Sequence, residues 1–165
     1  MTDPSQTYAQ AVEALNQGRW QQALSLADSL LSVAAGHAGV HFVAGVAALQ
    51  TGAMPRALGH LETAVRLNPS RPDYAAQWAR ALSSAAMARE ALEVARRALA
   101  QDPQDPMTLD TLGVVFTLAN AHEEAAQAFR GAVALQPRIA SYRFNLVTSL
   151  SILGDMQGAE REHEA

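Results

Sequence analysis

The stretch Arg96–Gly113, RRALAQDPQDPMTLDTLG, places two prolines three residues apart in an alanine-rich sequence that otherwise has the character of a helix. Proline lacks a backbone N–H and costs about 3 kcal/mol in a helix interior, so Pro103 and Pro106 mark a helix boundary. Asp105 is a typical N-cap, and proline is favoured as the first residue of a helix. We therefore expect one helix to end before Pro103 and the next to begin at Pro106.

This boundary recurs along the chain with a period of 34 residues. Six of the seven prolines fall on two columns of the period, at Pro4, Pro69, Pro72, Pro103, Pro106 and Pro137. A further column of the same period contains Gly18, Gly52, Ala86, Asn120 and Gly154. Glycine and asparagine tolerate the left-handed backbone that follows a helix, so we expect a turn at each of these positions. Ala86 is the residue least suited to such a turn.

Apolar and small residues also repeat within each period. In the clearest repeat they are Leu109, Leu112, Gly113, Phe116, Ala125, Phe129 and Ala132. The spacing i, i+3, i+4, i+7 predicts two amphipathic helices in each repeat. Small residues at facing positions allow the two helices to approach closely, and larger side chains fill the space beside them. The small residues are Gly45, Ala79 and Gly113 in the first helices, and Ala57, Ala91 and Ala125 in the second helices.

The pattern resembles the tetratricopeptide repeat (TPR) family, whose signature is a large residue, Leu-Gly and an aromatic residue, followed by Ala, Phe, Ala and Pro. The resemblance implies an all-α fold, a right-handed superhelical solenoid of about 4.5 helix-turn-helix repeats of 34 residues. A single TPR array would cover residues 1–165, with units at 4–37, 38–71, 72–105, 106–139 and 140–165. The first unit matches the signature least well, and the last unit is incomplete. We expect that the chain continues beyond Ala165 or that its last helix frays, because nothing covers the apolar residues there.

Composition excludes several classes of function. The chain has 12 basic residues, all of them Arg, and 16 acidic residues, so its formal net charge is -4 and nucleic acid is not an expected partner. The absence of cysteine excludes disulfides, thiolate zinc sites and cysteine nucleophiles. The sequence has no apolar run long enough to span a membrane and no secretory signal, so we expect a cytoplasmic protein without membrane insertion.

The sequence offers little catalytic chemistry. His37 and His41 are four residues apart, a spacing that can place two metal ligands on one helix face. The repeat pattern instead places His37 at a helix start and His41 at a packing position, so we predict no metal site. Glu123 and Glu124 would lie near a helix start, where acidic side chains favour the helix dipole. No phosphate-binding loop, dinucleotide fingerprint or nucleophile elbow is present, and we expect neither catalytic residues nor a cofactor.

In the TPR family the first helix of each unit lines a concave groove that binds partner segments. The equivalent positions here are Tyr8, Val12, Phe42, Val46, Leu49, Gln77, Arg80, Asp110, Val114, Phe144 and Asn145. Their N-terminal members are apolar, and an exposed apolar patch indicates a partner, although part of it could instead pack between units. Arg80 is predicted to anchor a carboxylate or a carbonyl of a bound peptide, or else to pair with Asp110.

We therefore predict a non-catalytic protein-interaction scaffold that binds a partner peptide or helix in this groove. One alternative is the TPR region of a larger bacterial enzyme, such as a sulfotransferase or a glycosyltransferase. A second alternative is a secretion or pilus-assembly chaperone. Self-association through the uncapped C-terminal end is a further expectation. Capture of an acidic chaperone tail is not expected, because the chain lacks Lys and because Tyr8, Val12 and Val43 are apolar where a carboxylate clamp needs polar residues.

Overall fold

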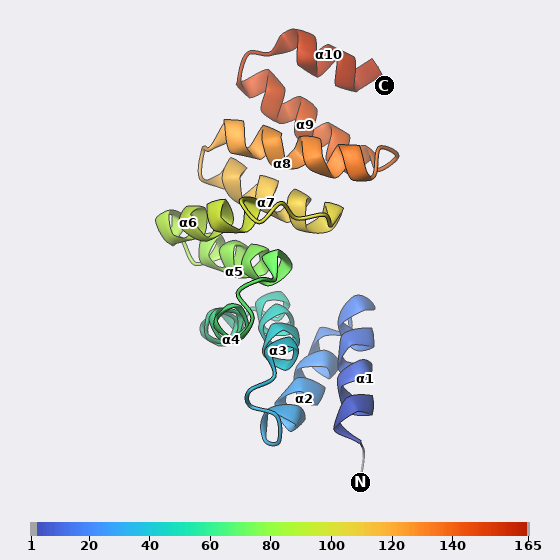
Figure 1. The fold of residues 1–165 in the computed structure, drawn as a ribbon, viewed down its shortest axis with the longest axis vertical. Coiled ribbons are helices and arrows are strands. Elements are labelled where there is room, and N and C mark those ends of the chain that lie inside the picture. Colours follow the sequence, from blue (N-terminus) through green and yellow to red (C-terminus); the bar gives the residue numbers. More distant parts are fainter. Residues whose placement is uncertain (1–2, 165) are drawn as a thin grey trace. The chain divides into compact units, whose positions relative to one another are not determined.

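The computed structural model describes residues 3–164, and over this range it contains ten α-helices and no strand (Figure 1). The helices are α1 Pro4–Asn16, α2 Trp20–Leu31, α3 Ala38–Gln50, α4 Met54–Leu67, α5 Pro72–Ser84, α6 Ala88–Leu99, α7 Pro106–Leu118, α8 His122–Leu135, α9 Ala140–Ile152 and α10 Met156–Glu164. Short turns join them into successive helix-turn-helix pairs. The predicted all-α repeat architecture is therefore confirmed.

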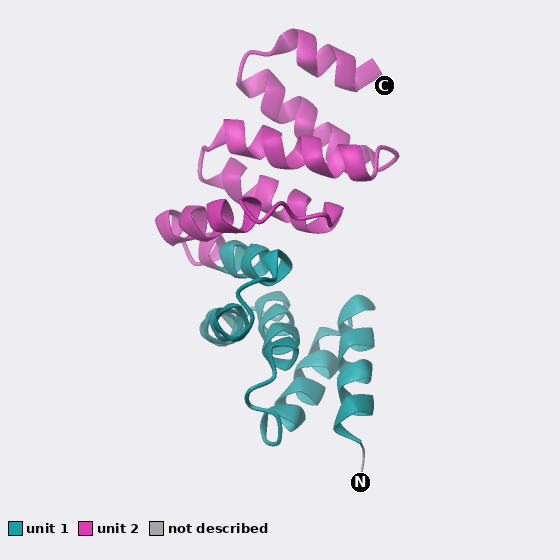
Figure 2. Cartoon of the chain, viewed as in Figure 1, with its two compact units in different colours: residues 1–81 teal, residues 82–165 magenta. Residues whose placement is uncertain are grey.

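The chain forms two compact units, residues 1–81 and residues 82–165, and the division falls within α5 (Figure 2). In the first unit, α2 packs against α1 and α3, and α3 packs against α4. In the second unit, α7 packs against α6 and α8, while α9 packs against α8 and α10. Within each unit these helices contact their neighbours in the sequence, as a stack of repeats requires.

The helix starts follow the capping chemistry expected from the sequence. Asp105 accepts hydrogen bonds from the backbone N–H of Thr108 at 2.9 Å and from its hydroxyl at 2.6 Å, and Pro106 is the first residue of α7. Asp3 likewise accepts from the N–H of Ser5 at 3.1 Å ahead of Pro4. Each cap satisfies a backbone donor that would otherwise lack a partner at the helix start.

The turn inside each helix pair has a left-handed residue at the predicted place. All five positions of the turn column have positive φ: Gly18 at 70°, Gly52 at 80°, Ala86 at 61°, Asn120 at 57° and Gly154 at 79°. Ala86 adopts this conformation despite its Cβ, which costs roughly 1–2 kcal/mol. The 34-residue period therefore determines the backbone conformation at Ala86 even though the residue itself disfavours it.

Close packing inside the helix pairs explains the small residues. A Cβ added to Gly113 would lie 2.4 Å from the ring of Phe129, and one added to Gly45 would lie 2.6 Å from Leu61. The second-helix alanines, Ala57, Ala91 and Ala125, are fully buried. Glycine in α3 and α7 thus leaves the space that Leu61 and Phe129 occupy, as the sequence predicts.

Candidate protein-interaction surface

The first unit buries much of the apolar surface that the sequence analysis assigns to the groove. Val46 is only 8% exposed and packs with Leu61 and Ala81. Val12 and Leu49 are half-buried and pack against the core of the unit. Neighbouring side chains cover these aliphatic residues. This part of the apolar patch therefore serves packing, which is the alternative that the sequence analysis left open.

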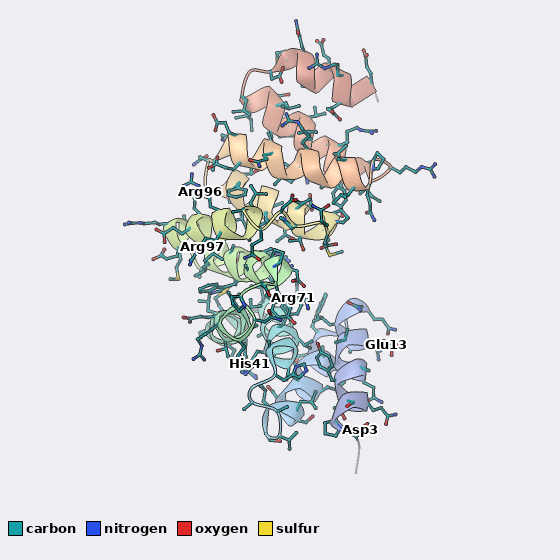
Figure 3. The ribbon with its side chains drawn as sticks, viewed as in Figure 1. Asp3, Glu13, His41, Arg71, Arg96 and Arg97 are labelled. Carbon is teal, nitrogen blue, oxygen red and sulfur yellow. The ribbon has the colours of Figure 1, made fainter. Side chains whose placement is uncertain are left out.

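Aromatic side chains of the first unit form a separate cluster. Phe42 stacks on Tyr74 with ring centroids 4.5 Å apart and an interplanar angle of 20°. The guanidinium of Arg71, which is labelled in Figure 3, lies 4.5 Å from the centroid of the Tyr74 ring. It donates to the carboxylate of Asp73 at 2.6 and 2.9 Å. The hydrogen bond to Asp73 raises the pKa of Arg71, and burial raises the pKa of Tyr74. Tyr8, another predicted groove residue, is half-buried, and its ring centroid lies 4.8 Å from that of His37.

Tyr74 is absent from the sequence-based candidates although it supports Phe42 directly. It shares a repeat position with Val40 and Thr108, and the three are 2 to 5% exposed. Because Val40, Tyr74 and Thr108 are 34 residues apart, a comparison of these equivalent positions in the sequence would have drawn attention to Tyr74. Phe42 is therefore held by stacking on its neighbour in α5 and remains half-buried.

Two polar candidates lie on α5. Gln77 is half-buried, and its Oε1 atom is inaccessible to solvent and has no hydrogen-bond partner in the described part of the chain. Arg80 is exposed. A buried amide oxygen without a donor carries a free-energy penalty, and this atom could accept from a partner only if the side chains that cover it moved.

In the second unit a hydrogen bond joins two predicted groove residues. Asn145 of α9 donates its side-chain N–H to the carboxylate of Asp110 of α7 at 2.9 Å. Asp110 also contributes to the raised pKa of Tyr142, for which burial is the main cause. This bond links the first helices of two successive pairs.

The same two helices expose large apolar side chains. Phe144 is 70% exposed and Val114 is 39% exposed, and both are predicted groove residues. Three further residues, Met107, Leu118 and Ile152, are 53 to 66% exposed and were not predicted. Leu118 and Ile152 are 34 residues apart, so the repeat column contains the signal that identifies them. We name these five residues the α7–α9 face.

A hollow of about 300 Å³ adjoins this face. It is lined by Ala140, Arg143, Phe144, Val147 and His163. Arg143 forms a long ion pair with Glu162, with Nε and Oε2 4.0 Å apart, and its buried Nε has no hydrogen-bond partner among the described residues. The hollow therefore combines an apolar wall with a cation that is only loosely paired.

Second helices carry ion pairs instead. Arg96 of α6 contacts Glu124 of α8 at 2.6 Å, and this hydrogen bond lowers the pKa of Glu124. Arg56 of α4 contacts Asp28 of α2 at 2.5 Å. Glu123 and Glu124 lie in the first turn of α8, as predicted. Exposed pairs of this kind stabilise a protein by less than about 1 kcal/mol each and do not by themselves indicate a site.

The histidines occupy structural positions. His37 is the N-cap of α3 and accepts from the N–H of Val40 at 3.2 Å, which confirms the predicted role at a helix start. His41 lies on α3 (Figure 3), with its Nδ1 3.1 Å from Nδ1 of His60 and its Nε2 2.8 Å from the carbonyl oxygen of Ala35. Burial, followed by the charges of His41 and Arg56, lowers the pKa of His60. Within residues 3–164, no group of three or more His, Asp or Glu side chains could hold a metal ion.

No helix in the described part of the chain is long and apolar enough to cross a membrane.

Comparison with known proteins agrees with this architecture. A family model described as tetratricopeptide repeat matches residues 8–72 and 76–138. No curated protein sequence matches the chain significantly.

Solved structures share the fold at low sequence identity. MamA from Desulfovibrio magneticus RS-1, residues 41 to the end, is 20% identical with a TM-score of 0.73, over 99% of this chain and 93% of that chain. The thermophilic TPR protein TTC0263 of Thermus thermophilus is 21% identical with a TM-score of 0.75, over 90% of this chain and 82% of that one. YrrB, a TPR protein with an unusual peptide-binding site, is 18% identical with a TM-score of 0.67, over 97% and 82%.

Proposed function

The chain belongs to the tetratricopeptide repeat family, and from this premise we propose that it is a protein-interaction scaffold whose first helices bind a segment of a partner protein. The observation that carries the proposal is the exposure of Phe144 and Leu118, at 70% and 66%, on adjoining first helices of the second unit. Large apolar side chains that face water in a repeat protein mark a binding surface when they gather on one face.

The packing of the second unit supports this interpretation. Its core is supplied by other residues, among them Leu112, Phe116 and Leu146, which are fully buried. Phe144 therefore contributes little to stability, and its exposure costs solvation free energy that a partner would recover on binding. A bound segment that covers Phe144 and Leu118 would resemble the hydrophobic centre of an ordinary protein interface.

The first unit carries a second candidate surface for the partner. Phe42 is held against Tyr74, with ring centroids 4.5 Å apart, and remains half-buried. Arg80 is exposed on α5 and adds a positive charge. These side chains suit a segment that carries an apolar residue and a carboxylate.

A site-specific photocrosslinker tests the proposal. We would incorporate it at Leu118 in the native host, and at Val33 as a control, because Val33 is 71% exposed but lies outside both candidate surfaces. The expected result is one partner crosslinked from Leu118 alone, which the purified chain then binds directly.

Variants of the chain decide whether the surface itself is responsible. Phe144→Ala and Arg80→Glu are each expected to weaken binding of that partner, while the melting temperature changes by no more than a few degrees. Phe42→Ala is expected to weaken binding as well, with a larger fall in melting temperature because it loses the stacking on Tyr74. If all three variants bind the partner as the unchanged chain does, the proposed surface is wrong.

A further inference from the structure

We propose that the α7–α9 face binds its partner as an amphipathic α-helix, with an acidic side chain of that helix directed to Arg143. This inference rests on the proposed function and specifies the kind of segment that the face takes.

The hydrogen bonds of the face argue against an extended segment. An extended peptide brings backbone N–H and C=O groups that need partners on the receptor when they are buried. On α7 and α9 four hydroxyl groups already donate within their own helices. These bonds, each 2.9 Å long, run from Thr111 to Met107, from Thr117 to Gly113, from Thr148 to Phe144 and from Ser151 to Val147.

The amide of Asn145 is committed in the same way, because one of its N–H groups donates to Asp110 at 2.9 Å. The face therefore offers few free donors to the carbonyl oxygens of an extended chain. A helix needs none of them, because its backbone groups bond to one another. An apolar stripe on such a helix is sufficient to cover the apolar side chains of the face.

The dimensions of the face suit a short helix. Met107, Val114 and Leu118 follow one another along a single side of α7, and the 11 residue-to-residue steps from the first to the last cover about 17 Å at 1.5 Å per step. On α9, Phe144 and Ile152 are eight residues apart, which corresponds to about 12 Å. A helix of about three turns, with apolar side chains at i, i+3, i+4 and i+7, matches this length.

The hollow beside Phe144 supplies an anchor and a charge. Its volume of about 300 Å³ accommodates one large apolar side chain against Ala140 and Val147. The ion pair of Arg143 with Glu162 is long, at 4.0 Å, and 26% of the Arg143 side chain is exposed. A carboxylate of the partner helix, about one turn from the apolar anchor, would accept from the terminal N–H groups of this guanidinium in charge-assisted hydrogen bonds.

Two displayed peptide libraries test this inference on the full chain. Both contain 18-residue peptides of the same overall composition. One has apolar residues at helical spacing and varied residues elsewhere, and the other has prolines at two central positions that prevent a helix. Selected peptides would be titrated against the unchanged chain and against Leu118→Asp, Phe144→Ala, Arg143→Gln and the control Val33→Ser.

We expect the selected peptides to come from the helical library and to carry Asp or Glu at a recurrent position. Their circular dichroism should show an increase in helix content on binding. Their affinity should fall at least tenfold in Leu118→Asp and Phe144→Ala, fall severalfold in Arg143→Gln and stay unchanged in Val33→Ser. The exposure of Leu118 and Phe144 predicts that both variants fold normally, and their melting curves would show this.

Two other outcomes separate this inference from the proposed function. Winners from the proline library that lose affinity in Leu118→Asp and Phe144→Ala would overturn the helical partner and leave the scaffold function in place. If no peptide from either library depends on Leu118 or Phe144, the α7–α9 face is not a binding surface, and both proposals fail for this unit.

Discussion

Replacing Gly113 with alanine should destabilise the protein, although alanine is the better helix former. An added Cβ would lie 2.4 Å from one atom of the Phe129 ring and 2.6 Å from two others. The ring cannot easily withdraw, because Phe129 is only 2% exposed. Overpacking of this kind lowers the free energy of unfolding by about 1–3 kcal/mol, whereas the better helix propensity of alanine raises it by about 0.5–1 kcal/mol. We expect a net loss of about 1–2 kcal/mol in the free energy of unfolding.

Gly59 provides a control with the opposite sign. It lies inside α4, and a Cβ added there meets nothing within 4 Å. Gly59→Ala should therefore stabilise the protein by about 0.5–1 kcal/mol through helix propensity alone. Urea unfolding followed by far-ultraviolet circular dichroism would separate the two midpoints by about 1 M, given slopes of about 1–3 kcal/mol per M.

A double-mutant cycle tests the named contact. Phe129→Leu shortens the side chain that faces Gly113, so the cost of Gly113→Ala should fall by about 0.5–3 kcal/mol in that background. Equal stabilities of Gly113→Ala and Gly59→Ala, or independent effects of Gly113→Ala and Phe129→Leu, would refute the close-packing explanation.

Three further predictions concern the caps, the turns and pH. Asp105→Ala removes the acceptor for Thr108 at the start of α7 and should cost about 1 kcal/mol, seen as a lower melting temperature. Ala86→Gly relieves the left-handed alanine at φ 61° and should stabilise the protein by about 1 kcal/mol, whereas a lower urea midpoint would contradict the strain. The pKa of His60 is lowered on folding, so its contribution to stability is present above the unfolded value of about 6.5 and is lost as pH falls through the folded value. Unfolding measured between pH 7.5 and 5 should therefore show a steeper acid loss in the unchanged chain than in His60→Asn, and equal slopes would exclude this role.

The helix boundaries could be predicted from the sequence because they depend on local backbone chemistry. Pro106 has no N–H to donate, Asp105 supplies the acceptor that α7 needs, and the turn residues tolerate positive φ. Even Ala86 adopts the left-handed conformation at 61° that its place in the period predicts. The period, the helix pairs and the glycines of close contact follow from such rules.

Side-chain contacts between helices required the tertiary structure. The stacking of Phe42 on Tyr74 and the pairing of His41 with His60 each join residues from different helices. The period places such residues near one another, but it does not specify which side chains meet or in what orientation. The hydrogen bond from Asn145 to Asp110 likewise depends on the packing of α7 and α9.

Val46 and Val114 show most clearly what a repeat pattern cannot predict. They are the same residue type at equivalent places two periods apart, so a repeat pattern assigns them one role. In the folded protein Val46 is 8% exposed and packs with Leu61 and Ala81, whereas Val114 is 39% exposed. The beginning, end and turn of each helix follow from the sequence, because they depend on local backbone chemistry. Which of two equivalent side chains remains available to a partner is set by the packing of the folded protein, because burial depends on the size and position of side chains from neighbouring helices.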